Sequence, residues 1–147
     1  MITNQQKGTR KLQLYELIHS IEVLDTREEK VSKIQSIVKS YPAFNDYVRC
    51  LFDESIQFHL PEGRPPYTPS SEAHPTSWNR EHMKLSYFVK GGGRDDMSQT
   101  KRETMWIQLL EGLHPEDSAI IADMTDKRHK TCLTKELLNE SVPGLIR

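Results

Sequence analysis

The chain has 147 residues, a common size for a single domain. Its 20 lysine and arginine residues nearly balance its 21 aspartate and glutamate residues, so no global charge would attract nucleic acid or membranes. Hydrophobic residues make up 35% of the chain, and no run approaches the ~20 apolar residues that span a bilayer. The N-terminal residues lack the apolar stretch of a signal peptide, so we expect a cytosolic protein with no membrane partner and a small core.

Three amphipathic helices are predicted in the N-terminal part, residues 10–54. Apolar residues repeat at helical spacing over about residues 10 to 24. Thr26 and Glu29 form a capping box that opens the second helix. Pro42 ends the second helix, and the apolar pattern then continues into a third.

A proline-rich segment, residues 60–76, follows these helices and holds five of the eight prolines. Proline suits neither a helix interior nor an inner strand, so the segment is either a bare linker or a strap ordered across the surface. Pro66 and Pro69 have the spacing of a polyproline-type ligand for a partner protein. We expect an ordered strap in which Tyr67 and the proline rings pack over helices. The candidate partner surface consists of Tyr67, the two prolines and Arg64.

The C-terminal part, residues 77–142, is predicted to contain four more helices. Their expected first residues or caps are Thr76 or Ser77, Thr100, Pro115 and Thr134. Thr100 and Glu103 have the pattern of a second capping box. The helix that they open carries one apolar stripe, which consists of Trp106, Leu109, Leu110 and Leu113. Two acidic residues after Pro115 favour the positive end of the next helix.

The predicted fold is therefore all-α. It is a single compact domain over residues 1–147, with about seven short helices, an ordered proline-rich strap and no sheet.

A glycine loop at residues 90–94 allows two interpretations. Three bare glycine N–H groups between Lys90 and Arg94 resemble an anion cradle. The loop follows a helix instead of a strand, however, and runs into Asp95, whose charge opposes phosphate. We therefore expect the glycines to end a helix and act as a hinge.

Basic residues near the second half of the chain offer candidate contacts to nucleic acid. A cationic turn lies between two predicted short helices, a spacing loosely similar to helix-turn-helix proteins. The other interpretation is a solvated loop that offsets the negative end of the preceding helix. The six candidate phosphate contacts are Lys101, Arg102, Lys127, Arg128, Lys130 and Lys135.

The sequence contains no pattern that assigns a catalytic residue, a cofactor or a metal. The six histidines are scattered, and Cys50 and Cys132 fit no zinc spacing. Asp123 and Asp126 lie three residues apart on one predicted helix, but no second helical pair with histidine accompanies them. We expect both aspartates to be surface groups.

Four stretches of the chain resemble a known family. They are residues 52–69 with the pattern FxLPEG-PPY, residues 85–92, residues 101–115 with the pattern KRE…LLE-LHP, and Leu133-Thr134 with the ending 142–146. Together they are similar to small uncharacterised proteins of contractile-tailed phages, notably phages of cyanobacteria and related marine bacteria. The family has no established activity, so the resemblance implies no site residues.

The resemblance implies a phage accessory protein in the cytoplasm of the infected bacterium or packaged in a particle. We expect it to be non-catalytic and to bind a protein of a host machine or of a phage assembly. A nucleic-acid-binding protein and a structural component of the virion are the alternatives.

Overall fold

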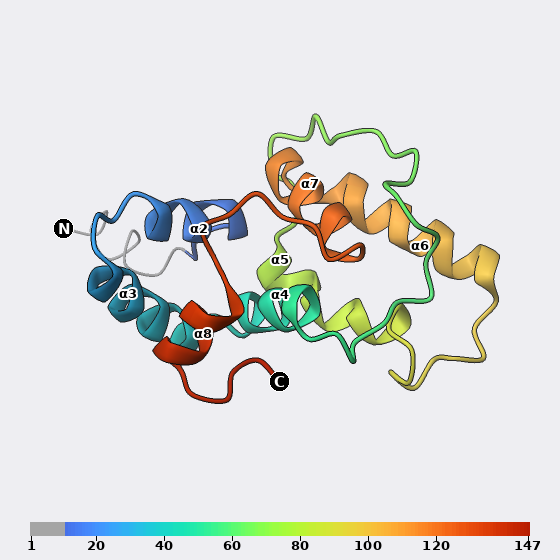
Figure 1. The fold of residues 1–147 in the computed structure, drawn as a ribbon. Coiled ribbons are helices and arrows are strands. Elements are labelled where there is room, and N and C mark those ends of the chain that lie inside the picture. The colour runs from blue at the N-terminus through green and yellow to red at the C-terminus, as the bar shows by residue number, and fades with distance from the viewer. Residues whose placement is uncertain (1–10) are drawn as a thin grey trace.

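The computed structural model describes residues 11–147, and these residues form an all-α fold, as predicted (Figure 1). Residue 10, where the first predicted helix begins, lies outside the described residues, as does the rest of 1–10. The described elements are α2 (Leu14–Glu22), α3 (Arg27–Ser40), α4 (Pro42–Phe52), α5 (Trp78–Glu81), the 3-10 helix η1 (His82–Tyr87), α6 (Gln99–Gly112), α7 (Pro115–Met124) and α8 (Lys135–Ser141). Within residues 11–147 the only strand-like pairings are isolated bridges, Phe58 with Val89 and Thr76 with Leu113.

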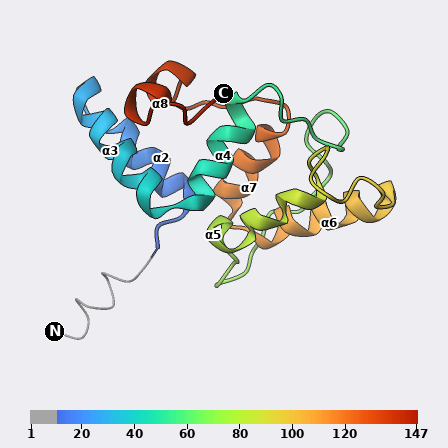
Figure 2. The same cartoon turned by 90° about the horizontal axis from the view of Figure 1, so that it is seen from below.

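The helices pack in two groups around one core. Figure 2 shows α2, α3, α4 and α8 on one side and α5, α6 and α7 on the other. The C-terminal helix α8 packs against α3, so the two ends of the described chain share one group. A single cluster of buried apolar residues runs through both groups. Burial of each large apolar side chain contributes about 1.5–3 kcal/mol, so this shared core unites the groups.

Local sequence signals set several helix boundaries as predicted. The Thr26 hydroxyl accepts a hydrogen bond from the Glu29 N–H at 3.1 Å, and the Glu29 carboxylate accepts one from the Thr26 N–H. Thr134 caps α8 in the same way through the Leu137 N–H. Pro42 ends α3 and is also the first residue of α4, where its missing N–H costs no helical hydrogen bond.

The predicted apolar stripe of α6 is confirmed. Its four members, Trp106, Leu109, Leu110 and Leu113, are between 0% and 6% exposed. The ring of Trp106 meets the edge of Phe88 with 5.0 Å between centroids. This contact joins α6 to the segment after η1.

Two predicted elements differ from the structure. Helix α6 begins two residues earlier than expected, because the Ser98 hydroxyl and not that of Thr100 caps it, by accepting from the Lys101 N–H at 3.1 Å. Ser98 and Thr100 are both good caps, and the first one along the chain is used. The helix expected after Ser77 is only one α-turn, and it continues as the 3-10 helix η1. Residues three apart share a face in a 3-10 helix, and this geometry buries Leu85 and Phe88 together.

A buried carboxylate joins the two helix groups. Asp117, in the first turn of α7, is fully buried and accepts hydrogen bonds from the backbone N–H groups of Leu14, at 3.3 Å, and Tyr15, at 2.8 Å. These are the first two N–H groups of α2, which have no partner inside their own helix. The sequence predicted that Asp117 stabilises the positive N-terminal end of its own helix, α7. Its carboxylate also accepts hydrogen bonds from the first N–H groups of a second helix, α2.

The titration of Asp117 provides a first prediction. Burial raises its pKa from 3.8 to about 6, although the two N–H donors oppose this rise. The folded protein therefore binds this proton more tightly than the unfolded chain does, and the contribution of Asp117 to the free energy of unfolding falls as the pH rises from about 4 to about 6. An Asp117→Asn variant should lose this decline, which amounts to ~2–3 kcal/mol. Urea unfolding at a series of pH values measures it, and parallel profiles for both proteins would contradict the assignment.

Candidate functional site

The proline-rich segment is ordered and is anchored to α7 by side chains. The Arg64 guanidinium donates two hydrogen bonds to the Asp123 carboxylate, at 2.7 and 2.8 Å. The Gly63 N–H donates to the Asp126 carboxylate at 2.9 Å. The hydrogen bonds from Arg64 lower the pKa of Asp123, which keeps the pair ionised. The two aspartates, expected as simple surface groups, therefore hold the strap, residues 60–76.

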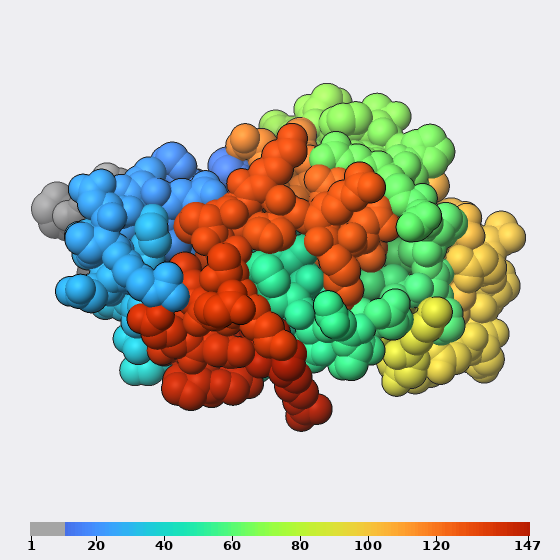
Figure 3. Space-filling model, viewed as in Figure 1, coloured from blue at the N-terminus to red at the C-terminus, as the bar shows by residue number. Residues whose placement is uncertain are grey.

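The middle of the strap is held by α6 and by the core. The Thr68 N–H donates to the Glu111 carboxylate at 2.8 Å, and the half-buried Tyr67 ring packs against core residues. Pro66 and Pro69 are exposed. In Figure 3 the green strap forms an outer edge of the molecule beside the orange segments. The strap therefore presents two proline rings to solvent in a fixed conformation.

Anchoring of the strap predicts that its loss destabilises the protein. Tyr67→Ala should lower the free energy of unfolding by ~1–3 kcal/mol, since a half-buried aromatic side chain is removed. The variant should also become sensitive to proteases between residues 62 and 76. Glu72→Ala changes an exposed residue of the same segment and serves as the control. Unchanged melting and equal protease sensitivity of the two variants would show that the strap is not anchored through Tyr67.

Lys127, a candidate phosphate contact, has a structural role instead. Its ammonium group donates hydrogen bonds to the carbonyl oxygens of Cys50, Asp53, at 3.0 Å, and Ile56, at 2.7 Å. The first of these oxygens belongs to the last turn of α4, whose final carbonyl groups have no partner inside the helix. Lys127 has φ of 60°, a left-handed conformation that is unfavourable for a residue with a side chain. The three hydrogen bonds offset this cost.

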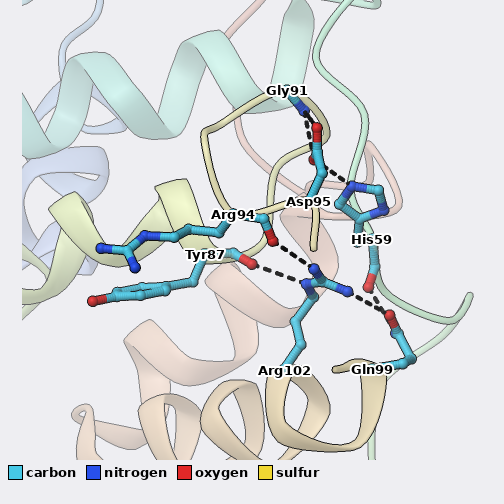
Figure 4. A network of polar contacts seen from close by, with 7 residues as sticks. All are labelled: His59, Tyr87, Gly91, Arg94, Asp95, Gln99 and Arg102. Carbon is cyan, nitrogen blue, oxygen red and sulfur yellow. Dashed lines mark hydrogen bonds and ion pairs between the residues drawn. The ribbon is translucent and has the colours of Figure 1, made fainter. Parts of the chain in front are cut away.

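Arg102 is likewise occupied inside the molecule. It is 2% exposed, and its guanidinium donates to the carbonyl oxygens of Tyr87, at 3.0 Å, and Arg94, at 2.8 Å. It also donates to the side-chain oxygen of Gln99, whose amide group in turn donates to the His59 carbonyl oxygen. Figure 4 shows these contacts converging on Arg102 from three segments. Arg102 therefore orders the glycine loop and leaves no face for a phosphate.

The glycine loop binds a carboxylate of its own chain. Asp95 accepts a hydrogen bond from the Gly91 N–H at 2.9 Å and contacts the His59 ring nitrogen at 2.7 Å (Figure 4). These contacts, the Gly91 N–H first, lower the pKa of Asp95. Gly91 and Gly93 have φ of 78° and 97°, the left-handed conformation expected where glycine ends a helix. The anion cradle considered from the sequence is thus filled by Asp95.

The other four candidate nucleic-acid contacts are exposed, and they do not form one surface. Lys101 lies in the first turn of α6 and Lys135 in the first turn of α8, and Figure 1 shows these helix starts on opposite sides of the molecule. Arg128 and Lys130 follow α7 and lie near each other beside Arg64. The cations that the sequence suggested are therefore divided between two internal sites and three surface regions.

The internal role of Lys127 is testable against a neighbouring lysine. Lys127→Met keeps the aliphatic chain but removes the ammonium group, so three carbonyl oxygens lose a charged donor. We expect a loss of ~1.5–3 kcal/mol in the free energy of unfolding. Lys130→Met removes an exposed cation three residues later, and its effect should stay within about 0.5 kcal/mol. Equal stability of the two variants, measured by urea unfolding, would contradict the capping role.

The described residues show neither a metal cluster nor a membrane helix. Within residues 11–147 no group of three or more His, Cys, Asp or Glu side chains is placed to hold a metal ion. Cys50 is buried and Cys132 is exposed, and both thiols are free. In the same part of the chain, no helix has both the length and the apolar character needed to cross a bilayer.

Comparison with known proteins gives one match. A family model described as a family of unknown function, DUF6433, matches residues 17–131. This range includes the strap, the glycine loop and the anchors on α6 and α7. No curated protein and no solved structure matches the chain.

Proposed function

We propose that this chain, which belongs to the family of unknown function DUF6433, is a non-catalytic phage accessory protein that binds another protein. The partner belongs to a host machine or to a phage assembly. It contacts the strap surface, which consists of Arg64, Pro66, Tyr67 and Pro69. The infected bacterial cytoplasm is the proposed site of action, and a place in the virion is the alternative.

The observation that carries this proposal is the anchored strap with its exposed proline rings. Ordering a flexible segment opposes binding, so a segment that is already ordered binds with a smaller entropic cost. Carboxylates of α6 and α7 hold the strap on both sides of Pro66. Tyr67 is half-buried against the core, so Pro66 and Pro69 are the main outward contacts for an aromatic groove of a partner, with the exposed part of Tyr67 between them.

The proposed phage context has a different support, namely the resemblance of four sequence stretches to proteins of contractile-tailed phages. The pattern FxLPEG-PPY, the most distinctive of these, covers the strap itself. It supplies Gly63, which contacts Asp126 just after α7, and Tyr67, which contacts the core, and Arg64 stands at its open position. The resemblance and the anchoring therefore concern the same segment.

The nucleic-acid alternative is less well supported by the geometry. Arg102 and Lys127 use their donors on carbonyl oxygens of the protein. The exposed cations that remain lie in separate surface regions, and binding to a DNA backbone requires several cations on one surface. We therefore rank it second.

The proposal is tested by affinity purification from infected cells followed by mass spectrometry. A tagged wild-type protein should recover a partner, and a Pro66→Ala/Pro69→Ala variant should recover at least about tenfold less, a loss of ~1.4 kcal/mol in binding. Ser71→Ala/Glu72→Ala changes two exposed residues of the same strap and should recover as much partner as wild type.

Three outcomes would contradict the proposal or change its ranking. Equal recovery by the proline variant would show that the strap is only structural, provided that circular dichroism shows a folded variant. Recovery that disappears after nuclease treatment would favour the nucleic-acid alternative. Detection of the protein in purified particles would favour the virion component.

A further inference from the structure

A groove of about 780 Å³ lies between α2 and α7. Tyr47 of α4 is among its lining residues, and residues 128–131 also border it. Its volume is in the range of pockets that bind small molecules. Several of its lining residues are apolar, among them Ile18, Ala119 and Ile120. The ring of Tyr15, stacked on His114 with 4.6 Å between centroids, adds an aromatic surface.

The hydroxyl group of Tyr47 is buried and has no hydrogen-bond partner within the described part of the chain. Its side chain is 0% exposed. Burial raises the pKa of Tyr47, and the charges of Asp123 and Glu22 raise it further. These two carboxylates also line the groove, on α7 and α2. The hydroxyl therefore stays neutral and keeps an unused O–H donor, which is unusual for a buried polar group.

The acidic residues of the groove, in contrast, have donors already. Both oxygens of Asp123 accept from Arg64, and the Glu22 carboxylate accepts from the Cys132 N–H at 3.2 Å. Glu16 accepts from the N–H of the residue before α2 at 2.8 Å. Each of these three carboxylates thus has at least one donor from the protein itself.

The cations at one end of the groove, unlike the carboxylates, have no hydrogen-bond partner in the described part of the chain. Arg128 and Lys130 are exposed, and neither side chain makes a hydrogen bond to another described residue. Both follow the C-terminal end of α7, whereas the exposed Glu116 lies in the first turn of that helix. Arg128, Lys130 and Tyr47 offer unused hydrogen-bond donors, whereas Glu116 offers an unused acceptor. The groove therefore has more free donors than free acceptors.

We propose that this groove binds a small organic anion with an apolar body. The anionic group, a carboxylate or a phosphate, contacts Arg128 and Lys130. A neutral oxygen of the same molecule accepts the hydrogen bond of Tyr47, and the apolar body lies against Ile18 and Ile120. Such a ligand supplies the hydrogen-bond acceptors that the groove lacks. The part of it that reaches Tyr47 is neutral, so no second negative charge is placed beside Glu22.

The probes for a test are 4-hydroxyphenylacetate, 4-hydroxyphenyl phosphate and tyramine, which all carry a neutral phenol oxygen, with calorimetry and thermal unfolding as readouts. Tyramine has nearly the same body as 4-hydroxyphenylacetate but carries a positive charge. We expect saturable binding of at least one anion with Kd below about 1 mM and no comparable binding of tyramine. The stronger of the two anions identifies the carboxylate or the phosphate as the preferred group.

Variants of the lining residues connect binding to the proposed contacts. Arg128→Gln/Lys130→Gln should weaken the anion at least about tenfold, whereas Lys101→Gln/Lys135→Gln removes two exposed cations elsewhere and should leave the affinity unchanged. Tyr47→Phe should weaken binding several-fold while leaving the melting temperature of the free protein unchanged or higher, since the removed hydroxyl has no partner.

Several results would overturn the proposal. They are equal affinity for tyramine, equal weakening by the two double variants, and no saturable binding of either anion. A lower melting temperature of free Tyr47→Phe would show that the hydroxyl is satisfied in solution, and would remove the observation on which the site rests.

Discussion

The buried carboxylate of Asp117 is the contact on which the arrangement of the helices depends. Removing a charge from water is costly, and the pKa raised to about 6 reflects that cost. Two N–H groups at the positive end of α2 offset part of it. Because Asp117 is rigidly placed in α7, this contact fixes where α2 begins relative to α7. The groove is lined by residues of α2 and α7, so the positions of its walls depend on the same contact.

Polar side chains of helix α7 and of the residues just after it contact several other parts of the fold. Asp123 and Asp126, on its last turn and just beyond, anchor the strap. The hydroxyl of Ser118 donates to a carbonyl oxygen of α6, at Leu110, and Lys127, just after the helix, caps α4. The helices of this chain are short, so unpaired groups at their ends are a large share of the backbone. Side chains from α7 and from Lys127 just after it satisfy several of these groups, which helps so lean a core to hold the helices together.

Much of the fold could be predicted because its signals are local. The Thr26 capping box, the Pro42 boundary and the apolar stripe around Trp106 each involve residues within a few positions of one another. The roles of Asp117 and Lys127 could not be predicted in this way. Their partners lie about 100 and 70 residues away in sequence, and nothing in the pattern distinguishes them from solvated charges. The groove was missed for the same reason, because its walls come from opposite halves of the chain.

The strap surface and the groove share one ion pair. Arg64 belongs to the strap and also lines the groove, and Asp123 holds it from the groove wall. Asp123 is further influenced by the charges of Arg128 and Lys130, which lower its pKa together with Arg64. The two surfaces therefore share one carboxylate, because Asp123 holds Arg64 of the strap and also lies in the wall of the groove.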